Sequence, residues 1–397
     1  RAHRECCHFI RHIQNMLANL TRSRVVRTSL NKAIYGCRPS FSAEFAKQYF
    51  GLKSEAVPAI NAVTQEGPIK VFDGTLKRMQ RDRAACLLSS KPDVLQDAIT
   101  ERLLDRMRDC LRKFPTALVL GGALPSARRH LEEDLGILAG VKHIIYVDTS
   151  SKMLTSIGAT PETIYSAAPP PSASDTLSNE GVIRTTYIQV GDFESFSNAL
   201  LERVGTIDVV IGCLGLHWYN DLPGVLFQAH HMLKPDGLFL GAIFGGDTLQ
   251  ELRIACALAE QERDGGLSAR VSPMAQVRDG GNLLGRAGFA LPAVDVDTIE
   301  MRYSHALELV EHLRRMGETN AVCNRRKRLS RDTALATGAL YQSMFAEDDG
   351  SVPATFHVIY FSGWSPDHNQ QQPKRRGSAT VSFADLEKEF GEGHLVE

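Results

Sequence analysis

Short apolar runs alternate with helical stretches through the middle of this 397-residue chain. Such alternation is typical of a parallel β-sheet with crossover helices, and runs rich in Val, Ile and Leu suit strands that are buried on both faces. The sequence therefore predicts a doubly wound α/β fold. The expected strands are Thr116–Leu120, His143–Val147, Thr185–Val190, Asp208–Gly212, Gly237–Phe244 and, as the last strand, Thr355–Phe361.

Amphipathic helices are expected before, between and after these strands. In the segment before the first strand, apolar residues recur at helical spacing with charged residues between them, which is the pattern of a helix with one buried face. A stretch rich in Pro, Ala and Ser at 167–174 interrupts the alternation and predicts a flexible insertion. The expected helices are Val94–Leu111, Ser195–Val204, Thr248–Arg263, Ala306–Met316 and Thr333–Phe345.

The charges are divided unevenly along the chain. Its net charge is −1, yet residues 1–53 carry ten Lys and Arg against two Asp and Glu. A segment rich in Arg, Ser and Thr and poor in acids is typical of an organelle transit segment, and a disordered basic arm is the alternative. With a turn-rich break at Gln65–Pro68, we expect a basic extension over residues 1–67, a folded domain over 68–365 and a polar, disordered tail over 366–397.

Composition and spacing argue against several classes of protein. No apolar run approaches the roughly 18 residues of a membrane-spanning helix, so we expect no span, while attachment to a membrane surface stays open. The eight cysteines form no C-x-x-C pair and no zinc-ligand spacing. His130 and Glu132 lie two residues apart in an expected helix, where they do not share a face, so we expect no metal site. Basic residues are not clustered with aromatics, which argues against nucleic acid as a partner.

Acidic residues follow two of the expected strands. In a doubly wound sheet, ligands bind at the carboxyl ends of the strands, where the strand order reverses. Asp148 follows the second strand, where a carboxylate can accept hydrogen bonds from both hydroxyls of a ribose, and Asp192 follows the third, where it can receive an adenine amino group. Either residue alone could instead cap a helix or form a turn. The two together predict a nucleotide site.

The loop after the first strand, Val119–Ser126, is the expected approach to the rest of such a ligand. Gly121 and Gly122 allow the backbone to come close to a bound molecule. Pro125 removes a backbone donor from the same loop. A plain turn from strand to helix, with Pro125 in the first helical turn, is the alternative.

The segment after the fourth strand, Cys213–Pro223, brings an imidazole, an indole and a phenol to the same edge of the sheet. Such an aromatic cluster more often belongs to the core. However, side chains alternate in direction along an extended segment, so His217, Trp218 and Tyr219 cannot all face one way. We therefore expect His217 or Trp218 to face the ligand cleft, and both are candidate catalytic residues.

Two sets of motifs resemble known families. The strand-end acids Asp148 and Asp192, together with the Leu-Lys-Pro-Asp-Gly turn at Leu233–Gly237, are similar to the class I S-adenosylmethionine-dependent methyltransferases. A more specific set resembles the mitochondrial complex I assembly factors of the arginine hydroxylase type, over roughly residues 70–383. That set comprises Leu216–Pro223, Gly245–Arg253, Leu283–Phe289 and Asp349–Thr355.

The resemblance implies a mostly parallel, seven-stranded sheet of the class I methyltransferase type with added C-terminal helices, so that residues 68–365 form a methyltransferase-like domain. It also implies S-adenosylmethionine as the cofactor. Asp148 then binds its ribose, Asp192 its adenine end, and Gly121 and Gly122 its methionine part.

This chain departs from the family's glycine-rich loop, which opens with an acid and carries three glycines. Val119 stands where the acid is expected, and Leu124–Pro125 replaces later positions. The resemblance, with these departures, predicts a weakened affinity for the cofactor.

The function implied by the resemblance is hydroxylation of an arginine in a core subunit of complex I during early assembly. The implied location is the matrix side of the mitochondrial inner membrane, with peripheral attachment, and the basic extension then contains a mitochondrial transit segment. The implied partners are that core subunit and other assembly factors.

A hydroxylase of arginine must also hold a guanidinium group, which pairs best with a planar carboxylate. Asp247 and Glu251 lie four residues apart at the start of an expected helix, so they could present two carboxylates on one face. We expect them to bind the substrate. An N-cap and a solvated helix face are the alternative.

Two further functions stay open at this point. One is a true S-adenosylmethionine-dependent protein methyltransferase, which an intact glycine loop would favour. The other is a non-catalytic assembly chaperone with a degenerate methyltransferase fold, which the altered loop favours and the retained motifs around His217 and Asp247 oppose. For oxygen activation, the sequence contains neither a convincing metal site nor a flavin fingerprint.

Overall fold

The computed structural model describes residues 70–88, 92–132, 139–168, 183–326, 328–371 and 377–378 of the chain. The expected basic extension with its transit segment lies outside the described residues. So do most of the expected insertion at 167–174 and most of the expected tail.

Within the described residues, eight strands build one sheet, in which β8 alone is reversed. The strand order is β3-β4-β2-β1-β5-β6-β8-β7, and β8 is antiparallel to both of its neighbours while the other pairs are parallel. The predicted fold class is confirmed. The count is eight rather than seven because the two-residue β3 is added at one edge. The strands are β1 Thr116–Leu120, β2 His143–Asp148, β3 Ile164–Tyr165, β4 Arg184–Gln189, β5 Ile207–Cys213, β6 Leu233–Phe244, β7 Ala290–Tyr303 and β8 Val352–Trp364.

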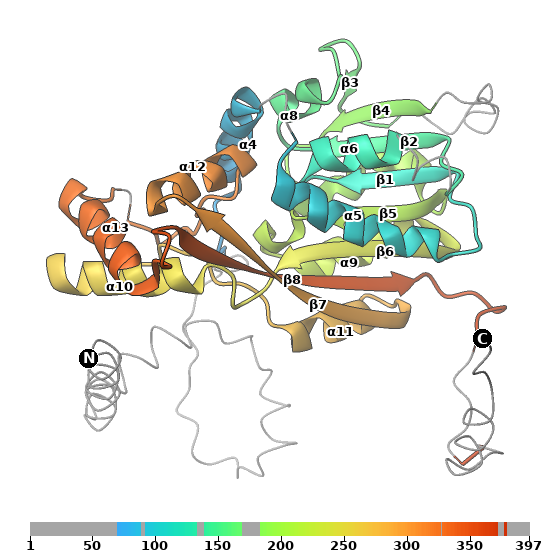
Figure 1. Cartoon of the computed structure of the whole chain (residues 1–397). Helices are drawn as coiled ribbons and strands as arrows, with labels where there is room; N and C mark the ends of the chain where they lie inside the picture. Colours follow the sequence, from blue (N-terminus) through green and yellow to red (C-terminus); the bar gives the residue numbers. More distant parts are fainter. Residues whose placement is uncertain are drawn as a thin grey trace, which may run out of the picture. The chain divides into compact units, whose positions relative to one another are not determined.

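Helices cover both faces of the sheet, as Figure 1 shows. Three elements cover one face, namely η2, α9 and α11, and most of the others lie on the opposite side or beyond the end of the sheet. The helices are α4 Gly74–Leu87, α5 Val94–Arg108, α6 Leu124–Glu132, α8 Ser151–Ser156, η2 Phe193–Arg203, η3 Leu216–Trp218, α9 Leu222–Met232, α10 Gln250–Arg263, α11 Val277–Arg286, α12 Ala306–Met316 and α13 Arg331–Phe345.

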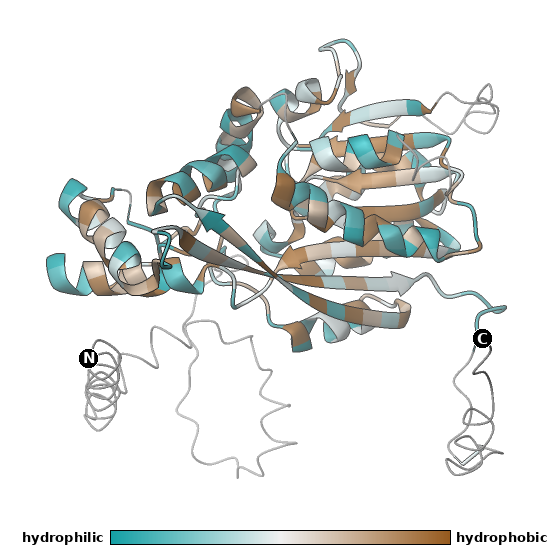
Figure 2. Cartoon of the chain, viewed as in Figure 1, coloured by the Kyte–Doolittle hydropathy of each residue, from teal (hydrophilic) through white to brown (hydrophobic). Residues whose placement is uncertain are grey.

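The core consists of two apolar layers separated by the sheet. In β1, Ala117 and Val119 pack into the layer beneath α5 and α6, whereas Leu118 and Leu120 pack into the layer beneath η2 and α9. Figure 2 shows the same arrangement as apolar central strands between helices with polar outer faces. Burial on both faces explains why the central strands read as continuous apolar runs in the sequence.

Among the elements that were not predicted, β7 and α4 do not follow the apolar pattern. The strand β7 lies at the edge of the sheet and is mostly exposed, so it carries no continuous apolar run. Helix α4 buries Lys77, Arg81 and Ala84, which means that its inward face is largely cationic. A search for apolar periodicity misses such a helix.

Within the described residues, no helix combines the length and the apolar character that crossing a membrane requires.

Candidate functional site

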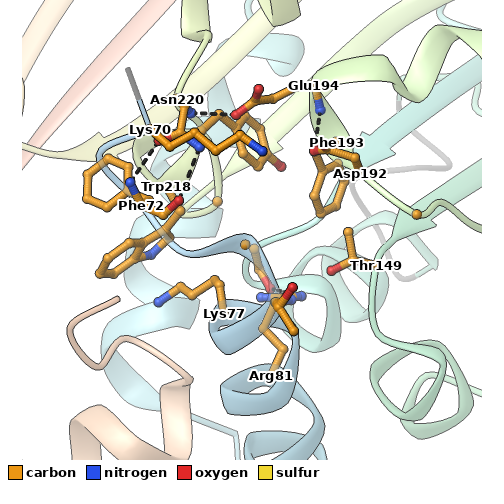
Figure 3. Close-up of a pocket in the computed structure, with 16 residues that line it drawn as sticks. Lys70, Phe72, Lys77, Arg81, Thr149, Asp192, Phe193, Glu194, Trp218 and Asn220 are labelled. Carbon is orange, nitrogen blue, oxygen red and sulfur yellow. Dashed lines mark hydrogen bonds between the residues drawn. The ribbon is translucent and has the colours of Figure 1, made fainter. Parts of the chain in front are cut away.

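A cavity of about 190 Å³ lies at the carboxyl ends of the parallel strands. Its walls come from the loops that follow β1, β2, β4 and β5, and from the N-terminal segment that runs from Lys70 into α4. Figure 3 shows this arrangement, with Asp192 and Thr149 on one side, Trp218 on the other, and Lys77 and Arg81 projecting from α4 between them. The cavity is therefore at the edge of the sheet where the doubly wound topology places ligands.

Asn220 fixes the N-terminal segment over this cavity. Its Oδ1 accepts hydrogen bonds from the backbone N–H groups of Val71 at 2.8 Å and Phe72 at 2.7 Å. Its own backbone N–H donates to Oε1 of Glu194 at 2.8 Å. These bonds join the segment before α4, the loop after β5 and the loop after β4 into one rim.

The glycine loop is shaped by close contact with the protein itself. Gly122 has φ +68°, and a Cβ atom built on it would lie 1.8 Å from the carbonyl oxygen of Cys213, so only glycine fits there. Gly122 lines the cavity. Gly121 does not, because the Phe193 ring and the Tyr219 hydroxyl cover it, at 2.7 and 3.3 Å from the position of a Cβ atom.

Asp148 is the last residue of β2, where the sequence placed it just after the strand, and its carboxylate is already bonded. Arg81 Nε donates to Oδ1 at 3.2 Å, and Arg81 Nη2 donates to Oδ2 and, at 3.1 Å, to the carbonyl oxygen of Gly122. The backbone N–H of Ser150 adds a bond to Oδ1 at 2.8 Å. Burial disfavours the charged form of Arg81, but the attraction of Asp148 outweighs this and raises the pKa of Arg81. Asp148, which was expected to bind the ribose, therefore forms a buried ion pair with Arg81 of α4. Arg81 lines the cavity instead of Asp148.

Asp192 lies in the cavity wall and also caps η2. Its Oδ1 accepts from the backbone N–H of Glu194 at 3.0 Å. The capping role was the alternative to a ligand role, and here one side chain has both the cap bond and a position on the cavity. The hydroxyl of neighbouring Tyr219 is buried and has no hydrogen-bond partner within the described residues.

His217 and Trp218 share one acceptor, the buried carboxylate of Glu318. Its Oε2 lies 2.9 Å from His217 Nε2 and 2.7 Å from Trp218 Nε1. Burial opposes ionisation of Glu318, but the charges of Lys77 and His217 and the hydrogen bonds from His217 and Trp218 lower its pKa to about 2. Trp218 lines the cavity, whereas His217 is not among the lining residues.

Lys77 completes this group from α4. Its ammonium lies 3.2 Å from the centroid of the Trp218 ring, and it donates to the carbonyl oxygens of Gly317 at 2.8 Å and Thr319 at 3.3 Å. Burial lowers the pKa of Lys77 to about 7, although the charge of Glu318 opposes this shift.

Sequence reasoning missed Lys77, Arg81 and Glu318. The signal for the first two was present, because they lie four residues apart and so share one face of α4. No local signal marks Glu318, which reaches His217 and Trp218 only through the fold.

The expected substrate carboxylates lie elsewhere. Helix α10 begins at Gln250, so Asp247 precedes it, and the predicted shared helical face is wrong. Asp247 is exposed, while Glu251 is buried and accepts hydrogen bonds from the backbone N–H of Thr355, at 3.2 Å, and from its hydroxyl. Neither side chain lines the cavity. Glu251 ties α10 to β8.

We expect Glu251→Ala to lower the free energy of unfolding by about 1.5–3 kcal/mol, because it leaves two half-buried donors on Thr355 without their carboxylate acceptor. The matched control Asp247→Ala changes an exposed carboxylate and is expected to stay within about 0.5 kcal/mol. Urea denaturation of both variants measures the difference. Equal effects would contradict the structural role of Glu251.

Among the described residues, no group of three or more His, Cys, Asp and Glu side chains is arranged to hold a metal ion.

The sheet order, the single reversed strand and the cavity at the strand ends define a protein of the class I methyltransferase type. No family model matches the chain. It is 40% identical over 321 residues to the zebrafish (Danio rerio) protein named "Arginine-hydroxylase NDUFAF5, mitochondrial", and the match covers 81% of this chain and 90% of the relative. The chain belongs to this arginine-hydroxylase family, which confirms the resemblance inferred from the motifs.

More distant comparisons lead to methyltransferases. The chain is 28% identical to the malonyl-[acyl-carrier protein] O-methyltransferase of Laribacter hongkongensis, over 78% of this chain and 96% of the relative. Among solved structures, the phosphoethanolamine N-methyltransferase 2 of Haemonchus contortus with S-adenosyl-L-methionine is 15% identical with a TM-score of 0.37, covering 73% of this chain and 57% of that one.

Proposed function

We propose that this protein is a mitochondrial enzyme that hydroxylates an arginine of a core subunit of respiratory complex I during its assembly. The observation that supports this most is the 40% identity to a named arginine hydroxylase over 90% of that relative's length. The proposed site is the cavity at the strand ends, with Trp218 in its wall and His217 behind it. The proposed location is the matrix side of the inner membrane, with other assembly factors as further partners.

Hydroxylation replaces a C–H bond of the arginine side chain by C–OH. Molecular oxygen supplies one atom to the product, the second leaves as water, and an electron donor provides two electrons with two protons. The chain's own contribution is to hold the guanidinium and to shield the reacting carbon from water. In this proposal Glu318 holds the Trp218 ring in the cavity wall and the His217 imidazole behind it.

S-adenosylmethionine is the proposed cofactor. Gly122, Thr149 and Asp192 line the cavity, and the buried Tyr219 hydroxyl beside Gly121 lacks a partner within the described residues, which fits a nucleoside ligand with polar groups. Such a cofactor carries a sulfonium-activated methyl group. Asp148, the residue expected to hold its ribose, is buried and paired with Arg81, so the ribose would compete with that ion pair.

The test is peptide mass spectrometry of complex I core subunits from cells whose copy of this protein is altered. Trp218→Phe removes the indole N–H that bonds Glu318, and we expect it to lower modification of the target arginine about tenfold, a loss of about 1.4 kcal/mol. The control is Trp364→Phe, on β8 against Phe114 and away from the cavity, which is expected to leave the modification unchanged.

The mass of the product separates the candidate functions. One added oxygen on arginine, lost with Trp218→Phe, supports the proposal. An added methyl group identifies a methyltransferase instead. If removal of the protein changes no residue of any subunit while assembly stops, the protein is a non-catalytic chaperone.

A further inference from the structure

Four residues around the amino group of Lys77 form a receptor for a cation. Trp218 offers the face of its ring, and Gly317 and Thr319 offer carbonyl oxygens. Glu318 adds an ionised carboxylate at the edge of the ring, where it accepts the indole N–H. The negative ring face, the carbonyl oxygens and the carboxylate all attract positive charge. We call these four residues the cation receptor.

The present occupant of the cation receptor is a weak one. Burial brings the pKa of Lys77 to about 7, so near neutral pH its ammonium form is only half populated. The charged groups that act on it are Glu318, from the loop after α12, and Arg81 on its own helix, which Asp148 holds. Glu318 also bonds the His217 imidazole on η3. When Lys77 loses its proton, the charge of Glu318 is left without its main partner.

A guanidinium is better suited to the same place. It stays charged at any pH a protein experiences, it is planar, and it stacks on aromatic rings. The cation receptor is also reachable, because Lys77 and Trp218 both line the cavity, and Figure 3 shows the amino group of Lys77 beside the indole.

We propose that the cation receptor binds the guanidinium of the substrate arginine, and that Lys77 is an internal cation which the substrate displaces. This inference rests on the proposed function and assigns a substrate subsite on the cavity, which Asp247 and Glu251 do not line. It also gives the site a selectivity: a neutral urea group of the same shape cannot replace the cation.

The experiment uses the full chain with Trp364→Phe, which leaves Trp218 as the only indole, since the chain has two tryptophans. Fluorescence of Trp218 is titrated with N-acetyl-arginine amide and, as the matched neutral probe, with N-acetyl-citrulline amide. At pH 6, where most of Lys77 still carries its proton, we expect Lys77→Met to bind the arginine probe about tenfold more tightly than the parent, because the internal competitor is gone. It is expected to show no gain for citrulline. Lys77→Arg, which keeps a permanent cation on α4, is expected to bind the arginine probe more weakly than the parent.

A second measurement requires no new variant. The affinity of the parent for the arginine probe is expected to rise about tenfold from pH 6 to pH 8, as Lys77 loses its proton while Glu318 stays ionised, and this rise is expected to be absent in Lys77→Arg. This pH titration keeps the inference testable if Lys77→Met fails to fold. A thermal melt of the variant detects such a failure.

Two outcomes overturn the inference. One is equal binding of both probes, or of neither, by folded Lys77→Met; the other is an affinity of the parent that does not change with pH. The proposed function fails separately. Binding of the arginine probe without any oxygen on the arginines of complex I subunits would leave the subsite standing and remove the hydroxylase assignment.

Discussion

Asp148→Asn is expected to lower the free energy of unfolding by about 3–5 kcal/mol, because it leaves the guanidinium of Arg81 buried without its counter-charge. The two side chains are 0% and 6% exposed, so water cannot take over the lost bonds. Equilibrium urea denaturation at neutral pH measures the effect. A loss of this size at a residue next to a ligand cavity would show that the pair is part of the fold and not only of the site.

The matched control is Asp295→Asn. Asp295 also pairs with an arginine, Arg106 at 2.8 Å, but its side chain is 71% exposed, and an exposed pair contributes at most about 1 kcal/mol. The double variant Arg81→Met/Asp148→Asn removes both charges and is expected to recover much of the stability lost by Asp148→Asn alone. If Asp148→Asn costs no more than Asp295→Asn, the buried pair does not stabilise the fold.

The same pair bears on the affinity for a nucleoside cofactor. A ribose that reaches Asp148 exchanges its hydroxyl groups for the hydrogen bonds of Arg81, which include a bond to Gly122 in the glycine loop. Much of the binding energy of the ribose is then spent on opening the pair. The pair with Arg81 is therefore a second feature, beside the altered glycine loop, from which we expect a weakened affinity for the cofactor.

The parts of the fold that could be predicted are those in which apolar burial dictates the residue types. The strand β1 was predicted to the residue, because all of Ala117–Leu120 is buried. By contrast, β7 alternates between exposed and half-buried positions at the sheet edge, and α4 buries Lys77 and Arg81. Both carry too little apolar signal to be recognised without the structure.

The site was predictable only as far as topology fixes it. Gly122 and Asp192 follow strands of the parallel sheet, so their loops had to meet at one edge. The groups that complete the site come from distant parts of the chain: Arg81 is 67 residues from Asp148, and Glu318 is 100 residues from Trp218. The prediction that Asp247 and Glu251 share a helical face was wrong because it required Asp247 to be helical. Helix α10 begins three residues later, at Gln250.

The free energy of unfolding is expected to rise with pH between about pH 7 and pH 10.5. The lower limit is the pKa of Lys77 in the folded chain, which burial lowers, and the upper limit is its ordinary pKa in the unfolded chain. In this window the unfolded chain holds a proton on Lys77 that the folded chain has released, so raising the pH favours the folded state. Each pH unit is expected to contribute about 1.4 kcal/mol, and the whole window up to about 5 kcal/mol. Below pH 7 both states are protonated, and the contribution of Lys77 no longer changes.

The difference between the parent and Lys77→Met isolates this contribution, because all other titrating groups are common to both. Urea denaturation at several values between pH 7 and pH 10 is expected to give a slope about 1.4 kcal/mol per pH unit smaller in the variant. Lys70→Met removes an exposed lysine just ahead of the same helix and is expected to leave the slope of the parent unchanged. Parallel curves for the parent and Lys77→Met would mean that Lys77 keeps its proton in the folded chain. The cation receptor would then hold a permanent ammonium, and an arginine side chain could enter only by displacing a full charge.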